Sequence, residues 1–188
     1  MIDWHKHHFC YDEEKRRKKQ NPEKLLIGQG LSGGMVFMDI GSNDGFFAVS
    51  AAGIVGEKGR VYALDVNREA VERLMEKAKL QGLTNISTVV GEAEKIVFCK
   101  TCADMVFYAN VLHDFTDPLK ALRNAKLMLK QDGKLVDFDW KKKGPLGPPL
   151  KIRLSEEEVI KLLEQAGFTA IKTQDFSDDH YLISAASS

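Results

Sequence analysis

Acidic side chains lie at the ends of two apolar segments of this 188-residue chain, and a loop that contains glycine follows the first of them. Asp39 lies near the end of the apolar run Val36–Ile40, and the loop Gly41–Gly45 comes next. A second apolar run, Val61–Leu64, ends in Asp65. A strand, a glycine loop, a helix and a second strand that ends in an acid are typical of a nucleoside-binding βαβ unit. The chemistry of the chain therefore depends on which nucleoside cofactor this loop prefers.

The loop departs from the fingerprint that binds dinucleotides. That fingerprint has glycines spaced G-x-G-x-x-G and places a pyrophosphate at the N-terminus of a helix. Here Gly41 and Gly45 enclose Ser42, Asn43 and Asp44. Asp44 would repel a pyrophosphate, and the carboxylate two residues before the loop adds to the repulsion. The acids favour a ligand that has positive charge and no phosphate, such as S-adenosylmethionine.

Alternating strand and helix patterns supply the framework for these residues. The predicted strands are 36–40, 61–64, 86–90, 103–108, 134–140, 169–173 and 180–184. Asp132 and Gly133 form a turn before the fifth strand, and a capping box at Ser155–Glu158 opens the last helix. The pattern predicts an α/β fold with a doubly wound, mostly parallel seven-stranded sheet whose last strand is antiparallel.

Five segments, in chain order, resemble the motifs of class I S-adenosylmethionine-dependent methyltransferases. They are Asp39–Gly45, Asp65, Gly91–Glu94, Phe107–Asp114 and Leu127–Leu135. The last of them is similar to a turn of the subgroup that contains ubiquinone/menaquinone-biosynthesis and arsenite methyltransferases. The resemblance covers roughly residues 20–188 and departs from the family at Asn43, where a glycine is usual. Asn tolerates positive φ better than other non-glycine residues, so the turn can survive.

The resemblance implies a role for each residue of the site. Asp65 would hold both ribose hydroxyls, Glu92 would meet the adenine amino group, and His113 is the tentative catalytic base. The implied cofactor contacts are Asp39, Gly41, Ser42, Asn43, Gly45, Asp65, Val66, Glu92, Ala93 and Asn110. No metal ligand is implied. The alternatives are structural: Asp39 and Asp65 could be caps, Glu92 an exposed loop acid, and His113 a half-buried residue beside a solvated Asp114.

The chain divides into two predicted parts. Residues 1–30 form an N-terminal helical segment that acts as a lid, and residues 31–188 form the Rossmann-like methyltransferase domain. Asn21 and Pro22 fit the cap and the first position of a short helix that ends near Gly28.

The first twenty residues are polar and predict an irregular chain. The basic run Lys15–Lys19 is interpreted as a solvated helix face, with contact to a membrane surface or to nucleic acid as the alternative. His5, His7 and His8 are interpreted as polar lid residues, with a metal tract or an interaction tail as the alternative.

Composition narrows the possible partners and locations of the protein. The number of Lys and Arg residues equals the number of Asp and Glu residues, so the formal net charge is zero. The overall electrostatic field of the chain therefore does not favour nucleic acid as a partner. No apolar run approaches the roughly 20 residues that span a bilayer, and the charged N-terminus is unlike a signal peptide. Three cysteines do not make a disulfide framework, so a cytoplasmic location is expected. Cys99 and Cys102 have the spacing of half a metal or redox site, but they are interpreted as ordinary residues that lead into the fourth strand. A soft metalloid site that includes Cys10 is a further alternative.

The sequence therefore predicts transfer of a methyl group from S-adenosylmethionine, by in-line displacement, to a small-molecule acceptor. The segment Gly144–Pro149 is stiff and apolar and is predicted to form part of the rim around that acceptor. Two alternatives remain open at this point: a protein that binds S-adenosylmethionine without catalysis, and an NAD-dependent oxidoreductase.

Overall fold

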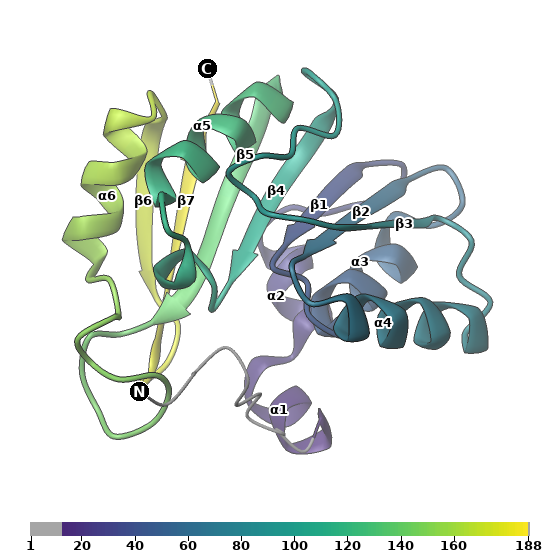
Figure 1. The fold of residues 1–188 in the computed structure, drawn as a ribbon, viewed down its shortest axis with the longest axis horizontal. Coiled ribbons are helices and arrows are strands. Elements are labelled where there is room, and N and C mark those ends of the chain that lie inside the picture. The colour runs from purple at the N-terminus through teal and green to yellow at the C-terminus, as the bar shows by residue number, and fades with distance from the viewer. Residues whose placement is uncertain (1–12, 188) are drawn as a thin grey trace.

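The computed structural model describes residues 13–187 and contains one mixed sheet between two layers of helices (Figure 1). The helices are α1 (Glu13–Gln20), α2 (Pro22–Gly28), α3 (Phe46–Val55), α4 (Arg68–Leu80), the short 3₁₀ turn η1 (Leu112–Asp114), α5 (Pro118–Met128) and α6 (Glu156–Gln165). The strands are β1 (Val36–Ile40), β2 (Arg60–Asp65), β3 (Ile86–Val90), β4 (Ala103–Ala109), β5 (Leu129–Trp140), β6 (Thr169–Asp175) and β7 (His180–Ala186).

The sheet has seven strands in the order β3-β2-β1-β4-β5-β7-β6. Strands β1 to β5 pair in parallel, and β7 runs antiparallel to both of its neighbours. The predicted fold class is therefore confirmed. The chain reverses its direction of winding between β1 and β4, and the crevice at the carboxyl ends of such strands is where open α/β sheets bind ligands.

The central strands β1, β4 and β7 are buried on both faces, which separates the core into two layers. Along β1, Phe37 packs with α2 and α3, whereas Met38 and Ile40 pack in the layer that contains α5 and α6. Strands that are buried on both faces read as nearly continuous apolar runs, which is why 36–40 and 103–108 are readily found from sequence. A buried acid in such a run, such as Asp39, is therefore unusual.

The N-terminal part differs from the prediction. Residues 13–20 form α1 rather than irregular chain. Arg16 and Arg17 are half-buried, so the basic run is not a fully solvated helix face. The predicted histidine tract and Cys10 lie outside the described residues. The predicted boundary at residue 30 stays a prediction, although Leu25 and Leu26 of α2 are buried in the same core layer as α3.

The predicted turn at Asp132 and Gly133 is also wrong, because β5 begins earlier than expected. Leu129 already pairs with Ala103 of β4, and the regular register resumes at Lys134 after an irregularity. A Cβ atom at Gly133 would lie 2.8 Å from the carbonyl oxygen of Ala103. The glycine thus permits β4 and β5 to approach closely inside a bulge instead of ending a turn.

The cysteines ahead of β4 differ from their interpretation as ordinary residues. Cys99 and Cys102 form a disulfide, with their Cα atoms 6.1 Å apart. The bend of the chain before β4 brings the two side chains together, and their spacing of three residues was the signal for this local pair.

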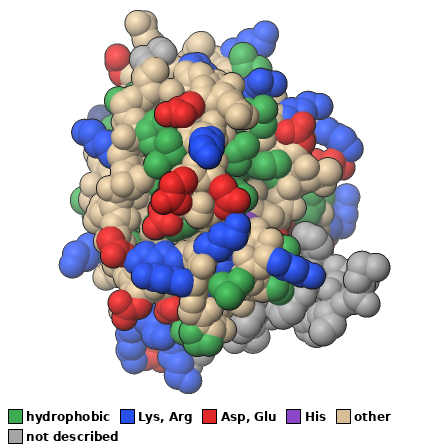
Figure 2. Space-filling model, turned by 90° about the vertical axis from the view of Figure 1, so that its left-hand side faces the viewer, with side chains coloured by type: hydrophobic (Ala, Val, Ile, Leu, Met, Phe, Trp, Pro, Cys, Tyr) green, Lys and Arg blue, Asp and Glu red, His purple; other side chains and the backbone are tan. Residues whose placement is uncertain are grey.

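Charged side chains of both signs lie at the surface that Figure 2 shows. On the face that Figure 2 shows, acidic and basic side chains lie intermixed among apolar ones and form no extended patch of a single sign. Within residues 13–187, no helix is long and apolar enough to cross a membrane.

Gly45 at the start of α3 should be sensitive to substitution. Its φ is +87°, and an added Cβ would overlap the side chain of Leu74 on α4. We expect Gly45→Ala to lower the free energy of unfolding by about 1–3 kcal/mol, measured by urea titration. Gly53→Ala is the matched control, because Gly53 lies in the same helix with open space around it, and alanine there should stabilise by up to about 1 kcal/mol. Equal effects of the two substitutions would show that the close approach at Gly45 is unimportant.

Candidate active site

A cavity of about 550 Å³ opens at the carboxyl ends of β1, β2 and β4, where the winding of the sheet reverses. This volume lies within the range of roughly 300–1,000 Å³ that is usual for small-molecule sites. The walls come from the loop after β1, the end of β2, the segment after β3, η1, α1 and the loop after β5. One cavity therefore collects most of the residues that the sequence singles out.

Nearly all the predicted cofactor contacts line this cavity. They are Asp39, Gly41, Ser42, Asn43, Asp65, Val66, Glu92, Ala93 and Asn110. His113 also lines it. Gly45 does not, because it lies behind the loop and faces Leu74. Its role is to let α3 approach α4, and it makes no part of the cavity wall.

The glycine loop is held in shape by the acid at the end of β2. Asn43 adopts φ +46°, as its residue type permits, and its backbone N–H donates to Asp65 Oδ2 at 2.8 Å. Asp65 Oδ1 accepts from the backbone N–H of Asn67, also at 2.8 Å. These two bonds fix the Asp65 carboxylate at the cavity wall, where it joins the loop to the cap of α4.

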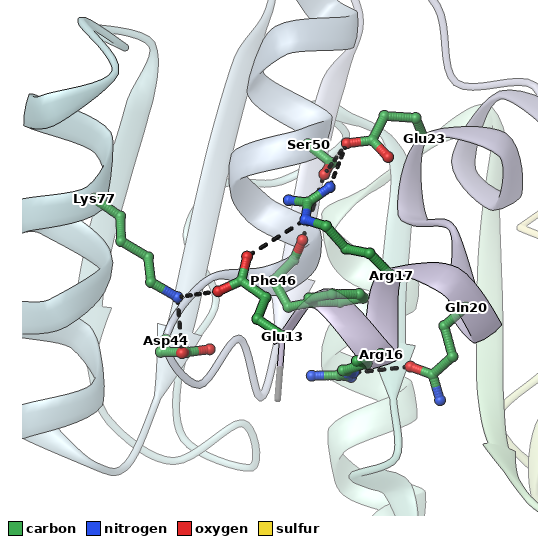
Figure 3. Close-up of polar contacts among 9 residues, drawn as sticks. All are labelled: Glu13, Arg16, Arg17, Gln20, Glu23, Asp44, Phe46, Ser50 and Lys77. Carbon is green, nitrogen blue, oxygen red and sulfur yellow. Dashed lines mark hydrogen bonds and ion pairs between the residues drawn. The ribbon is translucent and has the colours of Figure 1, made fainter. Parts of the chain in front are cut away.

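Asp44 is turned away from the cavity, contrary to the role given to it in excluding a pyrophosphate. Its Oδ2 lies 2.8 Å from Lys77 Nζ of α4 (Figure 3), and it does not line the cavity. Among residues 13–187, the carboxyl groups at this end of the cavity are therefore those of Asp39 and Asp65. The Asp44 side chain points away because it pairs with a lysine 33 residues further along the chain. The sequence of the loop itself does not reveal this contact.

Three buried acceptor atoms on the cavity wall have no hydrogen-bond partner within the described part of the chain. They are Asp39 Oδ2, Ser42 Oγ and Asn110 Oδ1. Burial raises the pKa of Asp39 to about 7, and the negative charge of Asp65 adds to the rise. A backbone hydrogen bond from Ala48 and the charge of Arg16 act in the opposite direction. Because unpaired buried polar groups are costly, this arrangement favours a ligand that donates hydrogen bonds and carries positive charge.

His113 forms a pair that sequence inspection missed. Its Nδ1 lies 2.9 Å from both carboxylate oxygens of Asp139, and the backbone N–H of Trp140 donates to Asp139 Oδ1 at 2.7 Å. Burial lowers the pKa of His113, but the charge and hydrogen bond of Asp139 and the charge of Asp114 outweigh it and raise the pKa above its ordinary value. Two acids in the buried strand segment Asp137–Asp139 were the available signal, since acids are rare at such positions.

The two acids of the segment after β3 have different surroundings. Glu92 lies at the cavity wall and forms an ion pair with Lys95, with 2.7 Å between Oε1 and Nζ. Glu94 Oε1 accepts from the backbone N–H groups of Thr116 and Asp117 and so ties this segment to the start of α5. The assignment of Glu92 to adenine stays a prediction.

Comparison with known proteins supports the predicted family. A family model described as a methyltransferase domain matches residues 31–178. The chain is 34% identical to a SAM-dependent methyltransferase from Aquifex aeolicus, and the two structures agree with a TM-score of 0.85 over 93% of this chain and 98% of that one. An arsenic(III) S-adenosylmethionine methyltransferase from Chlamydomonas reinhardtii shares the fold, with a TM-score of 0.67 and 21% identity over 82% of this chain and 64% of that one.

A curated relative matches over a shorter stretch. The chain is 30% identical over 122 residues to the ubiquinone/menaquinone biosynthesis C-methyltransferase of Haemophilus ducreyi, a match that covers 64% of this chain and 46% of that protein. The chain thus spans about half the length of the curated relatives it matches. The family model, the similar Aquifex structure and the cavity at the switch point of the sheet agree with one another, and the chain belongs to the methyltransferase domain family.

Proposed function

We propose that the chain binds S-adenosylmethionine in this cavity and transfers its methyl group to a small-molecule acceptor. The observation that carries the proposal is the set of three unpartnered acceptors, Asp39 Oδ2, Ser42 Oγ and Asn110 Oδ1. An α-ammonium group has three N–H donors and a positive charge, which match this set in number and in sign. A pyrophosphate has only acceptors and negative charge, so it would leave Asp39 Oδ2 and Asn110 Oδ1 unsatisfied.

The remaining cavity residues divide between the two ends of such a ligand. Asp65 would accept from the ribose hydroxyls, and Glu92, which also lines the cavity, would meet the adenine amino group. When bound, S-adenosylmethionine supplies a methyl group made electrophilic by the sulfonium. The chain's own contribution is mainly to orient the acceptor toward that group, and alignment of this kind can supply roughly 7–11 kcal/mol of a barrier.

His113 can accept the proton of the methyl acceptor. Asp139 accepts the hydrogen of Nδ1, so Nε2 is the basic nitrogen of the neutral ring. Because the pKa of His113 is raised, the neutral ring becomes the main form only above the ordinary pKa of histidine, and the rate should rise with pH through this raised pKa. A base of this kind suits an acceptor that loses an O–H, N–H or activated C–H proton.

The acceptor itself is to be found by experiment. The relatives' names point to quinone precursors and to arsenic(III), and the apolar rim at Gly147 and Pro148, which lines the cavity, favours an apolar ring. We expect a screen with labelled S-adenosylmethionine against quinols, phenols, amines and arsenite to give transfer to at least one class. If the chain binds the cofactor but transfers label to none of these acceptors, the result would favour the non-catalytic alternative. The cytoplasmic location and the absence of nucleic acid among the partners stay predictions.

Binding of the cofactor should be linked to the ionisation of Asp39. Its pKa of about 7 means that the carboxyl is largely protonated at pH 6, and a cation bound beside it favours the ionised form. Binding should therefore release close to one proton at pH 6, and affinity should rise roughly tenfold between pH 5.5 and 7. Calorimetry in buffers of different ionisation enthalpy measures the release. Asp39→Asn should abolish it, and undiminished release from that variant would show that another group titrates.

A further inference from the structure

The disulfide between Cys99 and Cys102 lies at the surface of the domain, just before β4. The two residues that it encloses, Lys100 and Thr101, are exposed, and the cysteines themselves are half-buried. A bond that closes so short a loop restrains the unfolded chain less than a bond between distant residues does. Exposed disulfides are also reduced more easily than buried ones, and they are the kind that serves in regulation or catalysis. Loop length and exposure thus favour a bond that opens and closes in the folded protein.

The loop inside the disulfide adopts an unfavourable backbone conformation and caps α5. Thr101 has a φ of +51°, in the left-handed region that β-branched residues rarely adopt. Its N–H donates to the carbonyl oxygen of Leu127 at 3.0 Å, and the N–H of Cys102 donates to that of Met128 at 2.9 Å. These two carbonyl groups belong to the last turn of α5, where carbonyls lack partners within the helix. Opening the disulfide would therefore remove one of the restraints that hold this cap in place.

The same helix holds the segment that runs from the cavity to the disulfide. Residues 91–98 follow β3, and the first four of them line the cavity. The carbonyl oxygen of Ala93 accepts from the side-chain amide of Asn124 at 2.9 Å. The N–H of Phe98 donates to the sulfur of Met128 at 3.4 Å. Both ends of the segment are thus bound to α5, the helix that the disulfide loop caps.

A metal site at the two cysteines is less well supported than exchange chemistry. A structural zinc ion takes four protein ligands, and two sulfurs supply only half of them. Within residues 13–187, no group of three or more His, Cys, Asp or Glu side chains is placed to hold a metal ion. The chemistry that remains for the pair is the exchange between a disulfide and two thiols.

We propose that Cys99 and Cys102 are a site of thiol–disulfide exchange, and that closure of their bond strengthens the binding of S-adenosylmethionine through residues 91–98. The second part rests on the function proposed above, whereas the exchange itself does not. An external thiolate attacks one sulfur of the bond and forms a mixed disulfide, and the other cysteine leaves as a thiolate that takes up a proton. A second external thiol then attacks the mixed disulfide. The two external thiols leave as a disulfide, and two electrons and two protons pass to the chain.

The coupling acts in both directions, because closure of the bond and binding of the cofactor are linked equilibria. If closure strengthens cofactor binding by a given factor, bound cofactor favours closure by the same factor. We expect a factor of about 5- to 50-fold, within the usual range for coupled sites. A tenfold coupling would shift the reduction potential of this two-electron couple by about 30 mV.

Equilibration in glutathione buffers of varied ratio, followed by alkylation of the free thiols, measures the exchange. The Cys10→Ser variant serves as the parent, because it leaves only the proposed pair among the three cysteines of the chain. Calorimetry gives the affinity of S-adenosylhomocysteine for the oxidised parent and for the parent in excess dithiothreitol. We expect the reduced form to bind about 5- to 50-fold more weakly. Saturating S-adenosylhomocysteine should shift the exchange constant toward the disulfide by the same factor.

Hydrogen exchange tests the link between the bond and the cavity wall without any ligand. Reduction should raise amide exchange across residues 91–102 and in the last turn of α5, and it should leave α4 unchanged as the internal control. Adding Cys99→Ser and Cys102→Ser to the parent should give the amide exchange and the affinity of the reduced form. This variant should not respond to dithiothreitol, whereas the parent should.

The outcomes distinguish failure of this proposal from failure of the proposed function. A bond that stays closed in excess reduced glutathione and opens only when the domain unfolds would be structural and would overturn the proposal. A pair that stays open in excess oxidised glutathione would overturn it too. So would equal affinity and equal amide exchange in the two states. If amide exchange responds to reduction but neither state binds S-adenosylhomocysteine, the result would refute the proposed function while supporting the exchange site and its link to residues 91–98.

Discussion

Replacing His113 with Asn is expected to slow methyl transfer by roughly 10²–10⁴-fold, which is the usual contribution of a positioned general base. Asp139→Asn should cost a similar factor, because it removes the charge that stabilises the protonated ring and can reverse the hydrogen bond at Nδ1. Both variants should still bind S-adenosylhomocysteine, since the proposed contacts to the cofactor come from other residues. The measurement is the single-turnover rate with the acceptor that the labelled-methyl screen identifies.

The pH profile separates a base from a structural histidine. In the wild-type chain the rate should rise through a pKa above the ordinary value for histidine, because only the neutral ring can accept a proton. Asp139→Asn should move this limb to lower pH while the plateau falls, since the charge of Asp139 is the largest influence that raises the pKa. A full rate in His113→Asn would assign the pair to structure and would point to an acceptor that needs no base.

Replacing Asp65 with Ala is expected to weaken binding of S-adenosylmethionine by about 2–4 kcal/mol, or roughly 30- to 1,000-fold. The carboxylate would lose the proposed bonds to the ribose. It would also lose the bonds from the backbone N–H groups of Asn43 and Asn67, each at 2.8 Å, which shape the loop. Both effects act in the same direction. Equilibrium dialysis with labelled cofactor measures the loss.

Asp44→Ala is the matched control for Asp65→Ala. It removes a carboxylate from the same loop, but this one faces Lys77 and does not line the cavity. We expect an effect below about 1 kcal/mol, as for a partly exposed ion pair. If Asp44→Ala weakened binding as much as Asp65→Ala, the loss would come from the stability of the loop, and the ribose assignment of Asp65 would be wrong.

Residues at the ends of strands could be placed from the sequence because the fold fixes where strands end. Asp39, Asp65 and Asn110 follow apolar runs, and the parallel order of β1, β2 and β4 brings such positions to one edge of the sheet. Chain order and hydrophobic period, together with the resemblance to the methyltransferase motifs, thus sufficed to predict most of the cavity wall. Gly45 was placed in the right loop, but its close contact is with the side chain of Leu74, which no local pattern reveals.

Residues whose roles depend on distant partners could not be placed in this way. Asp139 meets His113 only because β5 lies beside β4 in the parallel register that the structure shows. Arg16, which lines the cavity, lies on a strongly polar helix with no apolar stripe, and its ring partner Phe46 is 30 positions away in the sequence. Side-chain direction at Asp44 and the position of α1 are set by such tertiary contacts and not by local propensity.

The central claim is that this cavity takes a sulfonium cofactor and not a dinucleotide. Calorimetric titration of the wild-type chain with S-adenosylmethionine and, separately, with NADH tests it most directly. We predict saturable binding of S-adenosylmethionine, weakened in Asp39→Asn and Asp65→Ala, and no binding of NADH. Tight binding of NADH without binding of S-adenosylmethionine would contradict the account.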